Sequence, residues 1–415
     1  MLVPLGEADA DTCGGKAGAL GTLLRAGLPV PGGFVVPFAA YRARLDAGAI
    51  GRALAELGDP PVAVRSSASG EDGARASAAG QHESFLAVCG AGAVAEAVRA
   101  CWASLYSPRA VGYRAASGGG DPVMAVIVQR QVDAEVSGVM FTGEPTRIEA
   151  SYGLGPSVVE GKVTPDSYAV TADGPVSRTL ADKRTRLDRR GTRLVTTDVP
   201  AHARNRPAID DATARRLAAV GERIAAVLGG RQDIEWAITG DDLWILQSRP
   251  VTAALPPPLS RGNASTTPLT GTPAASLLTG RQDAVPGTSP AGTGESGTTG
   301  TPEGATGALN GTPGSRGSAT GAARIVRGPG DFARVRPGDI LVCPYTDPAW
   351  TPLLRIAAGV VTETGGVLSH AAIVAREYGI PAVLGVRGAM DGLRDGALIT
   401  VDGNAGTVTT ATEIS

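Results

Sequence analysis

The sequence predicts a mixed protein of the α+β or α/β class, with two folded parts joined by a flexible linker. Residues 1–254 alternate helical and strand patterns, as a two-lobed α+β domain does. Residues 321–415 contain five short apolar strands and one clear helix, which predicts a smaller, β-rich domain. Between them, residues 255–320 are dominated by small and polar residues and are predicted to be a disordered linker.

The composition limits the class of protein. The chain has 415 residues, of which 43% are hydrophobic and 19% charged, so a wholly disordered or collagen-like chain is excluded. Its 38 Lys and Arg nearly balance 40 Asp and Glu, and the net charge of −2 favours neither a nucleic acid nor a membrane surface as partner. Four cysteines without CxxC spacing indicate no disulfide framework or zinc site. With no export signal or apolar run of about 18 residues, we expect a cytoplasmic protein.

The N-terminal part begins with a glycine-rich turn that leads into an amphipathic helix over residues 14–29. Strands are predicted at 61–69, 83–90 and 122–132, with a helix at 91–106 between the last two. A second amphipathic helix occupies 210–230, opened by Asp and closed by Gly-Gly. A hairpin of two strands around a Gly-Asp-Asp turn follows at 232–251.

The linker is the most biased segment. Residues 261–320 contain 13 Gly, 6 Pro, 13 Thr and 6 Ser and no aromatic residue, so they cannot form an apolar core. A coil of this length has a root-mean-square span of roughly 40 to 46 Å, enough to carry a small domain across a large one. A passive spacer is the alternative.

The C-terminal part carries strands in 321–328, 338–344, 357–363, 381–385 and 397–403. Its helix is predicted at SHAAIVAREYG, residues 369–379, with Ser369 as N-cap, Gly379 just past the end and Pro381 beyond. These signals make the helix boundaries well defined.

His370 stands where this helix begins, after a strand and a double glycine. A helix N-terminus presents free N–H groups and partial positive charge, which stabilises a phosphate and disfavours the cationic imidazole. His370 is therefore a candidate nucleophile that carries a phosphoryl group. The alternative is a structural histidine bonded to a backbone carbonyl.

Two cations are candidates for phosphate binding. Lys16 lies just inside the glycine-rich turn CGGKAGAL, which lacks Walker A spacing, and it could equally be a solvated surface lysine. Arg65 leaves a strand into a polar turn, where a fixed planar charge suits a triphosphate. A local ion pair with Glu71 or Asp72 is the other interpretation.

Glu235 and Gln247 stand twelve residues apart on the two strands of the predicted hairpin. One oxygen ligand from each would suit Mg²⁺ held partly by nucleotide phosphates. Arg249, two residues further, is expected on the same face. An exposed polar face of the hairpin is the alternative.

The motifs together resemble the family of phosphoenolpyruvate synthases, pyruvate phosphate dikinases and rifampin phosphotransferases. GGKAGAL, AVRSSASGED, AAGQHESFL, MAVIVQRQVDAEVSGVMFTGEP, SYGLGPSVVEGKVTPDSY and DIEWAI…LWILQSRPVT follow in the order of its ATP-grasp domain. GDILVCPYTDPAWTPLLRIAAGVVTETGGVLSHAAIVAREYGIPAVLGV is similar to its swivelling β/β/α phosphohistidine domain. The resemblance thus covers 1–254 and 321–415 and leaves out the linker.

The resemblance implies roles for particular residues and ATP and Mg²⁺ as cofactors. The residues implied to bind nucleotide are Lys16, Arg65, Gly80, Ser84, Gln129, Glu235, Gln247 and Arg249, with Glu235 and Gln247 also binding the metal. His370 would attack ATP, expel AMP and, after loss of inorganic phosphate, carry one phosphoryl group to an acceptor.

Two departures from the family concern Pro156 and the acceptor. The family commonly has Glu where this chain has Pro156, so a phosphate or metal contact is expected to be lost or moved to Glu160. Relatives carry an acceptor module after the histidine domain, or between the two domains as in rifampin phosphotransferases, and we find none in this sequence. Its order of domains resembles the rifampin enzymes.

We therefore expect a dikinase-type phosphotransferase, a kinase with paired acceptors, which phosphorylates a hydroxyl or enol of a small molecule, in secondary metabolism or antibiotic modification. A phosphocarrier that relays phosphate to a separate acceptor-binding protein is the alternative. A third interpretation is a protein that still binds ATP but has lost catalytic turnover, and Pro156 is the residue that suggests it.

Overall fold

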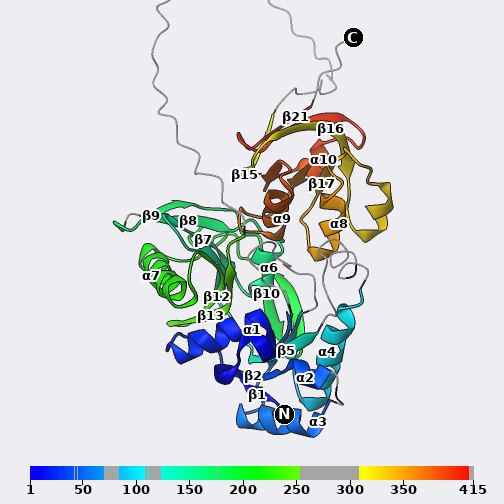
Figure 1. The fold of residues 1–415 in the computed structure, drawn as a ribbon. Coiled ribbons are helices and arrows are strands. Elements are labelled where there is room, and N and C mark those ends of the chain that lie inside the picture. The colour runs from blue at the N-terminus through cyan, green and yellow to red at the C-terminus, as the bar shows by residue number, and fades with distance from the viewer. Residues whose placement is uncertain are drawn as a thin grey trace, which may run out of the picture. The chain divides into compact units, whose positions relative to one another are not determined.

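The computed structural model describes residues 1–252 and 308–410, except 42, 44, 70–83, 108–110, 112–122 and 175. The described residues of both parts belong to one compact unit. The described residues contain helices and β-sheets in both parts of the chain, as the sequence predicts (Figure 1).

The first sheet has five strands in the order β1-β2-β5-β3-β4. Its strands are β1 Val3–Pro4, β2 Gly33–Val36, β3 Val62–Ala68, β4 Ser84–Val88 and β5 Met124–Arg130, with helices η1 Leu5–Glu7, α1 Ala10–Arg25, α2 Phe38–Tyr41, α3 Ala47–Glu56 and α4 Ala91–Ser104. Apolar residues of α3, α4 and this sheet form a buried cluster that includes Ile50, Val64 and Val98. The predicted helices and strands of this region are confirmed.

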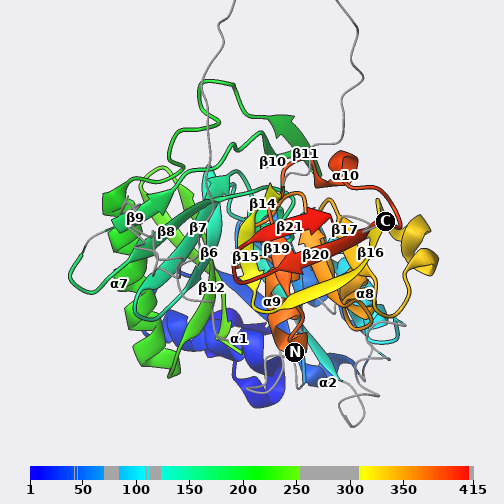
Figure 2. The same ribbon diagram turned by 90° about the horizontal axis from the view of Figure 1, so that it is seen from above.

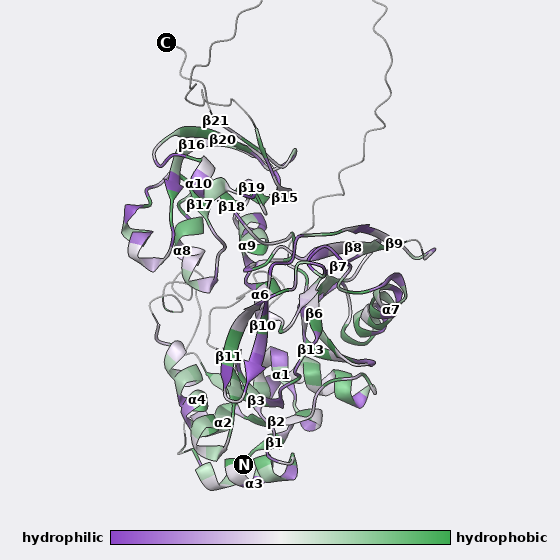
Figure 3. Cartoon of the chain, turned by 180° about the vertical axis from the view of Figure 1, so that it is seen from behind, coloured by the Kyte–Doolittle hydropathy of each residue, from purple (hydrophilic) through white to green (hydrophobic). Residues whose placement is uncertain are grey.

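The second sheet has six strands in the order β13-β12-β6-β7-β8-β9, and β10 and β11 form a separate hairpin. The strands are β6 Val136–Phe141, β7 Thr146–Tyr152, β8 Asp166–Val170, β9 Val176–Thr179, β10 Thr185–Arg190, β11 Arg193–Asp198, β12 Gln232–Thr239 and β13 Asp242–Pro250, with helices α6 Pro156–Val159 and α7 Asp211–Leu228. The long helix α7 covers one face of this sheet (Figure 1). Much of the β10–β11 hairpin is hydrophilic (Figure 3).

One apolar cluster joins the two sheets. It includes Val35 and Ile127 of the first sheet and Ile148 and Ile234 of the second, with Leu20 of α1 among them. Buried apolar area of this kind is the main favourable term in folding, so the two lobes are held together by a common core.

The C-terminal part forms an eight-stranded sheet in the order β14-β21-β20-β16-β17-β18-β19-β15, and Figure 2 shows β21, β20 and β16 side by side. The strands are β14 Leu309–Asn310, β15 Thr312–Ser315, β16 Ser318–Ile325, β17 Ile340–Cys343, β18 Gly359–Thr362, β19 Ala382–Leu384, β20 Leu398–Asp402 and β21 Thr407–Thr410, with helices η2 Pro329–Arg334, η3 Pro348–Trp350, α8 Thr351–Leu354, α9 His370–Tyr378 and α10 Ala389–Gly392.

The boundary predicted at residue 321 is wrong. Strands β14 and β15 and the first residues of β16 fall within 309–320, which the composition assigned to the linker. β14 pairs with β21 and β15 with β19, so glycine, threonine and serine here serve as edge strands of a sheet. Composition alone does not reveal pairing with partners about 70 to 100 residues away.

Candidate functional site

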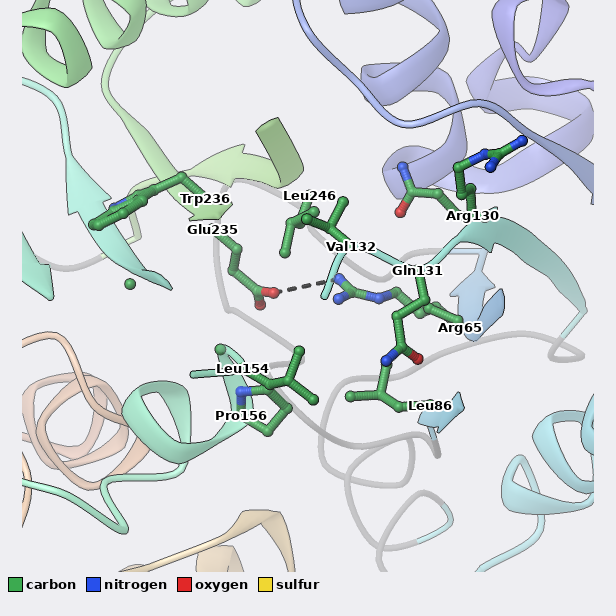
Figure 4. A pocket seen from close by; sticks show the side chains of 14 residues that line it. Arg65, Leu86, Arg130, Gln131, Val132, Leu154, Pro156, Glu235, Trp236 and Leu246 are labelled. Carbon is green, nitrogen blue, oxygen red and sulfur yellow. Dashed lines mark hydrogen bonds and ion pairs between the residues drawn. The ribbon is translucent and has the colours of Figure 1, made fainter. Parts of the chain in front are cut away.

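A pocket lies between the two sheets of the N-terminal part. Its lining includes Arg65 from β3, Gln129 from β5, Glu235 from β12 and Pro156 from α6. Figure 4 shows Arg65 reaching across the pocket to Glu235, with Pro156 on the side away from Leu246. A lining that combines apolar side chains with a few polar and charged groups is typical of a small-molecule site.

Arg65 and Glu235 form the polar centre of this pocket. Arg65 Nη1 and Glu235 Oε2 are 3.3 Å apart, with side chains 13% and 22% exposed. Arg65 Nε is also buried, and within the described residues no group accepts its hydrogen bond. Its predicted alternative partners, Glu71 and Asp72, lie outside the described residues. A buried donor left in this state is costly, so the site is suited to a ligand with acceptor oxygens.

The predicted pairing of Glu235 with Gln247 is present in the hairpin. The two residues are direct partners on β12 and β13, and a register shift follows Glu235. Side chains paired in this way lie on one face about 4.5 to 5.5 Å apart at Cβ. The hairpin therefore brings the two oxygen groups together.

Arg249 pairs with a carboxylate that the sequence reasoning missed. It lies opposite Asp233 in the register, and its Nη2 is 2.7 Å from Asp233 Oδ2. Asp233 is buried, so the ion pair balances the charge of Arg249 inside the structure. In the sequence, Asp233 stands two residues before Glu235, and this spacing was the signal available for it.

The remaining predicted nucleotide-binding residues lie in different places around the first sheet. Gln129 is buried and donates from Nε2 to the Pro31 carbonyl at 3.2 Å. Ser84 is exposed at the start of β4, where it is the direct partner of Arg65. Lys16 is half-buried in α1, and Gly80 lies outside the described residues.

The turn that carries Lys16 is built on one glycine. Gly14 has φ of 82° within α1, a conformation that favours glycine, and a Cβ there would overlap Ser67. Ser67 Oγ accepts from the Ala17 N–H at 3.2 Å. The start of α1 is thereby fixed against β3, the strand of Arg65.

His370 is the first residue of α9 and is 4% exposed. Its Nδ1 lies 3.0 Å from Thr346 Oγ1 and its Nε2 lies 3.4 Å from Thr351 Oγ1. Neither threonine was singled out from the sequence, although TDPAWT repeats the hydroxyl at an interval of five residues. The closer of these two contacts, at Nδ1, orients the ring, and the contact at Nε2 is the longer one.

Ser369 occupies the N-cap position but does not cap the helix. Its backbone is extended, with φ of −72°, as expected of an N-cap. Its hydroxyl, however, donates to the Gly366 carbonyl at 2.8 Å. Ser369 therefore closes the preceding turn and leaves the first N–H groups of α9 to other acceptors.

Glu149 is a buried carboxylate that the sequence did not point to. It is 2% exposed on β7, and it accepts hydrogen bonds from the N–H groups of Val367 and Leu368 at 2.6 and 3.2 Å. Burial raises its pKa to about 7, although both hydrogen bonds and the charge of Arg376 act in the opposite direction. A residue of the N-terminal part therefore contacts the loop that leads to His370.

This pKa predicts a pH dependence of stability. The folded protein holds the Glu149 proton more tightly than the unfolded chain, whose value is about 4.5, so Glu149 contributes less stability as pH rises from about 4.5 to about 7. The change is on the order of 3 kcal/mol. In urea unfolding, the wild type should lose stability relative to Glu149→Gln between pH 5 and pH 8. An equal difference at both pH values would contradict the shift.

Two family models match the chain. The first, "Pyruvate phosphate dikinase, AMP/ATP-binding domain", matches residues 47–258, just over half of the chain. The second, "PEP-utilising enzyme, mobile domain", matches 335–406. The chain belongs to the phosphoenolpyruvate synthase, pyruvate phosphate dikinase and rifampin phosphotransferase family.

Curated relatives agree with this family. The chain is 34% identical to the "Probable phosphoenolpyruvate synthase" of Methanothermobacter thermautotrophicus, over 97% of this chain and 62% of that protein. It is 36% identical to the "Phosphoenolpyruvate synthase" of Pyrococcus furiosus, over 84% and 40%. It is 37% identical to the "Rifampicin phosphotransferase" of Streptomyces sviceus, over 62% and 36%. The chain thus spans less than two thirds of the length of these relatives.

Solved structures match more weakly. The D-alanine-D-alanine ligase from Coxiella burnetii matches with a TM-score of 0.29 and 9% identity, over 57% of this chain and 47% of that one.

The family places the pocket residues in an AMP/ATP-binding domain. Within the described residues, no group of three His, Cys, Asp or Glu could hold a metal ion by itself. Glu235 and Gln247 offer one carboxylate and one amide oxygen, which suits Mg²⁺ because that ion takes few protein ligands when phosphates supply the rest. Pro156 lines the same pocket and offers no oxygen from its side chain. In the part of the chain that is described, no helix could span a membrane.

Proposed function

We propose that the chain is an ATP-dependent phosphotransferase of the dikinase type, which converts ATP to AMP and phosphate through a phosphohistidine. The observation that supports this most is the setting of His370. It opens a helix, and a threonine hydroxyl at 3.0 Å orients its Nδ1. A neutral imidazole with Nδ1 as donor has its lone pair on Nε2, the form required of a nucleophile.

In this proposal the N-terminal pocket holds the nucleotide. Arg65 contributes charge to the phosphates, and its Nε, which has no acceptor among the described residues, supplies a further donor. Glu235 and Gln247 would hold Mg²⁺, and the bound ion would neutralise phosphate charge. The residues assigned to the nucleotide are Lys16, Arg65, Gly80, Ser84, Gln129, Glu235, Gln247 and Arg249.

The reaction proceeds in three balanced steps. His370 Nε2 attacks the β-phosphorus of ATP, the bond between that phosphorus and the α–β bridging oxygen breaks, and AMP leaves with the electron pair. Water then cleaves the pyrophosphoryl group, and inorganic phosphate leaves. Finally an acceptor oxygen takes the remaining phosphoryl group, His370 regains its lone pair, and the acceptor proton passes to solvent.

We further propose the division into a nucleotide-binding domain at 1–254 and a phosphohistidine domain, with the segment between them as the linker. The corrected start of the second domain is residue 308. The length and composition of the linker support movement of the histidine domain between ATP and acceptor.

The acceptor in this proposal is a small molecule with a hydroxyl or enol group. The name phosphoenolpyruvate synthase supports an enol, because phosphoenolpyruvate is a phosphorylated enol, and the name rifampicin phosphotransferase supports an antibiotic as acceptor. We place the reaction in secondary metabolism or antibiotic modification because one relative is named rifampicin phosphotransferase.

Product analysis tests this function. Incubation with ATP and Mg²⁺ should give AMP and inorganic phosphate, measured by phosphorus NMR. Formation of ADP alone would overturn the dikinase assignment. Addition of a cell extract should then yield a metabolite heavier by about 80 Da, the mass of one phosphoryl group, whereas label appearing on another protein would favour a relay.

A further inference from the structure

A buried carboxylate of the nucleotide-binding part holds the loop that leads to the proposed nucleophile. Glu149 lies on the central strand β7, and its two oxygens accept separately from consecutive N–H groups, those of Val367 and Leu368. Leu368 is two residues before His370. Each bond is charge-assisted when Glu149 is ionised, and such bonds are about twice as strong as neutral ones.

The same loop is held from the other side by Arg376 of α9. Its Nη1 donates at 2.8 Å to the carbonyls of Val367 and Gly314. Burial lowers the pKa of Arg376 to about 10, while the charge of Glu149 raises it, so the two buried ions stabilise each other. Residue Val367 is thus bonded at its N–H by the nucleotide-binding part and at its C=O by the histidine part.

The close approach of Glu149 requires the absence of a side chain at position 366. A Cβ added to Gly366 would overlap the Glu149 carboxylate, and the three nearest atoms all belong to Glu149. The φ of Gly366 is not in the left-handed region, so the backbone alone does not demand glycine there. Glycine at position 366 therefore leaves room for the Glu149 carboxylate.

Apolar contacts continue the same junction. Leu368 and Ile373 are buried in one cluster with Val139, Phe141 and Val158 of the nucleotide-binding part. Beside them, Thr364 Oγ1 donates to the Gly161 carbonyl at 2.7 Å. These contacts bury apolar surface at the junction. The directional hydrogen bonds of Glu149 fix the position of the loop along β7.

We propose that Glu149 is a positioning residue that docks the His370 loop against the nucleotide-binding part, in the register needed for transfer from ATP. This rests on the proposed function. Glu149 does not line the pocket that contains Arg65 and Glu235. It acts through the loop and not on the reacting atoms.

A thiol-crosslinking experiment measures docking without any catalysis. Thr252 Oγ1 and Glu377 Oε1 are 2.9 Å apart across the junction, so Thr252→Cys and Glu377→Cys place two thiols within reach of a short bifunctional methanethiosulfonate linker when docked. The exposed Cys89 is removed by Cys89→Ser to avoid a competing reaction, whereas Cys13, Cys101 and Cys343 are buried. The rate of crosslinking at pH 8 is the readout.

In this background, Glu149→Ala and Gly366→Ala should each slow crosslinking by at least about tenfold. The double variant should be no slower than Glu149→Ala alone, because the atoms that a methyl group at 366 meets are gone. The matched control is Gly392→Ala in α10, where a Cβ meets nothing within 4 Å, and it should crosslink at the wild-type rate. Additive effects of the two variants, or an unchanged rate in both, would overturn the proposal.

His370 phosphorylation by ATP provides the second readout. Glu149→Ala and Gly366→Ala should lower its rate at saturating ATP by at least about tenfold and leave the Kd for ATP unchanged. A raised Kd with an unchanged rate would contradict positioning. If the wild type forms no phosphohistidine but crosslinking follows the expected pattern, the proposed function fails and the docking role of Glu149 stands.

Discussion

His370→Ala is expected to abolish covalent phosphorylation of the protein while leaving ATP binding intact. The imidazole is the only group assigned to carry the phosphoryl group, and the methyl group that replaces it offers no lone pair. The side chain belongs to α9, whereas the pocket residues Arg65 and Glu235 belong to β3 and β12. The variant should therefore lose phosphoryl transfer to the protein and keep ATP binding. Acid-labile label from ATP and the Kd for ATP are the two measurements.

The control for this variant is His202→Ala, since His202 is exposed and has no assigned role. It should keep wild-type labelling. Acid-labile label that persists in His370→Ala would show that another residue accepts the phosphoryl group. Loss of ATP binding in the same variant would instead indicate that the two parts do not act separately.

Glu235→Gln should lower the rate of AMP formation by at least about 100-fold. The carboxylate faces Gln247 and pairs with Arg65, so its neutral isostere removes charge from the proposed metal ligand and from the partner of a buried guanidinium. A metal ion stabilises developing phosphate charge by several kcal/mol, and each 1.36 kcal/mol is a factor of ten in rate. Rates measured across a range of Mg²⁺ concentrations should show a weaker apparent metal affinity.

Glu222→Gln is the matched control, because Glu222 is exposed on α7. It should leave both rate and metal dependence unchanged. If Glu235→Gln turns over at the wild-type rate with the same Mg²⁺ dependence, the metal site lies elsewhere and Glu235 serves only to hold Arg65.

Local sequence signals predicted local structure well. The helix at His370–Tyr378 ends at Gly379 in the left-handed conformation, as a glycine after the last turn indicates. The hairpin follows from a short turn between two strands, but counting from that turn would pair Glu235 with Leu246, and the register shift after Glu235 is what makes Gln247 its partner. Both depend on residues close in sequence.

Contacts between distant residues could not be predicted in the same way. Glu149 and Val367 are 218 residues apart, and the sequence around Glu149 reads as an ordinary strand. Thr346 is separated from His370 by two short helices and a strand, so its hydroxyl could be placed beside the ring only by the fold. The edge strands at 309–315 were missed because their polar composition resembles that of the linker.

Which phosphate of ATP remains on the protein decides whether the chain is a dikinase that works through His370. Parallel reactions contain ATP labelled at the β-phosphate or at the γ-phosphate, without acceptor, and run until AMP formation stops. A dikinase should give acid-labile protein label from the β-phosphate alone, at His370, with the γ-label recovered as inorganic phosphate. Protein label from the γ-phosphate with release of ADP would contradict it.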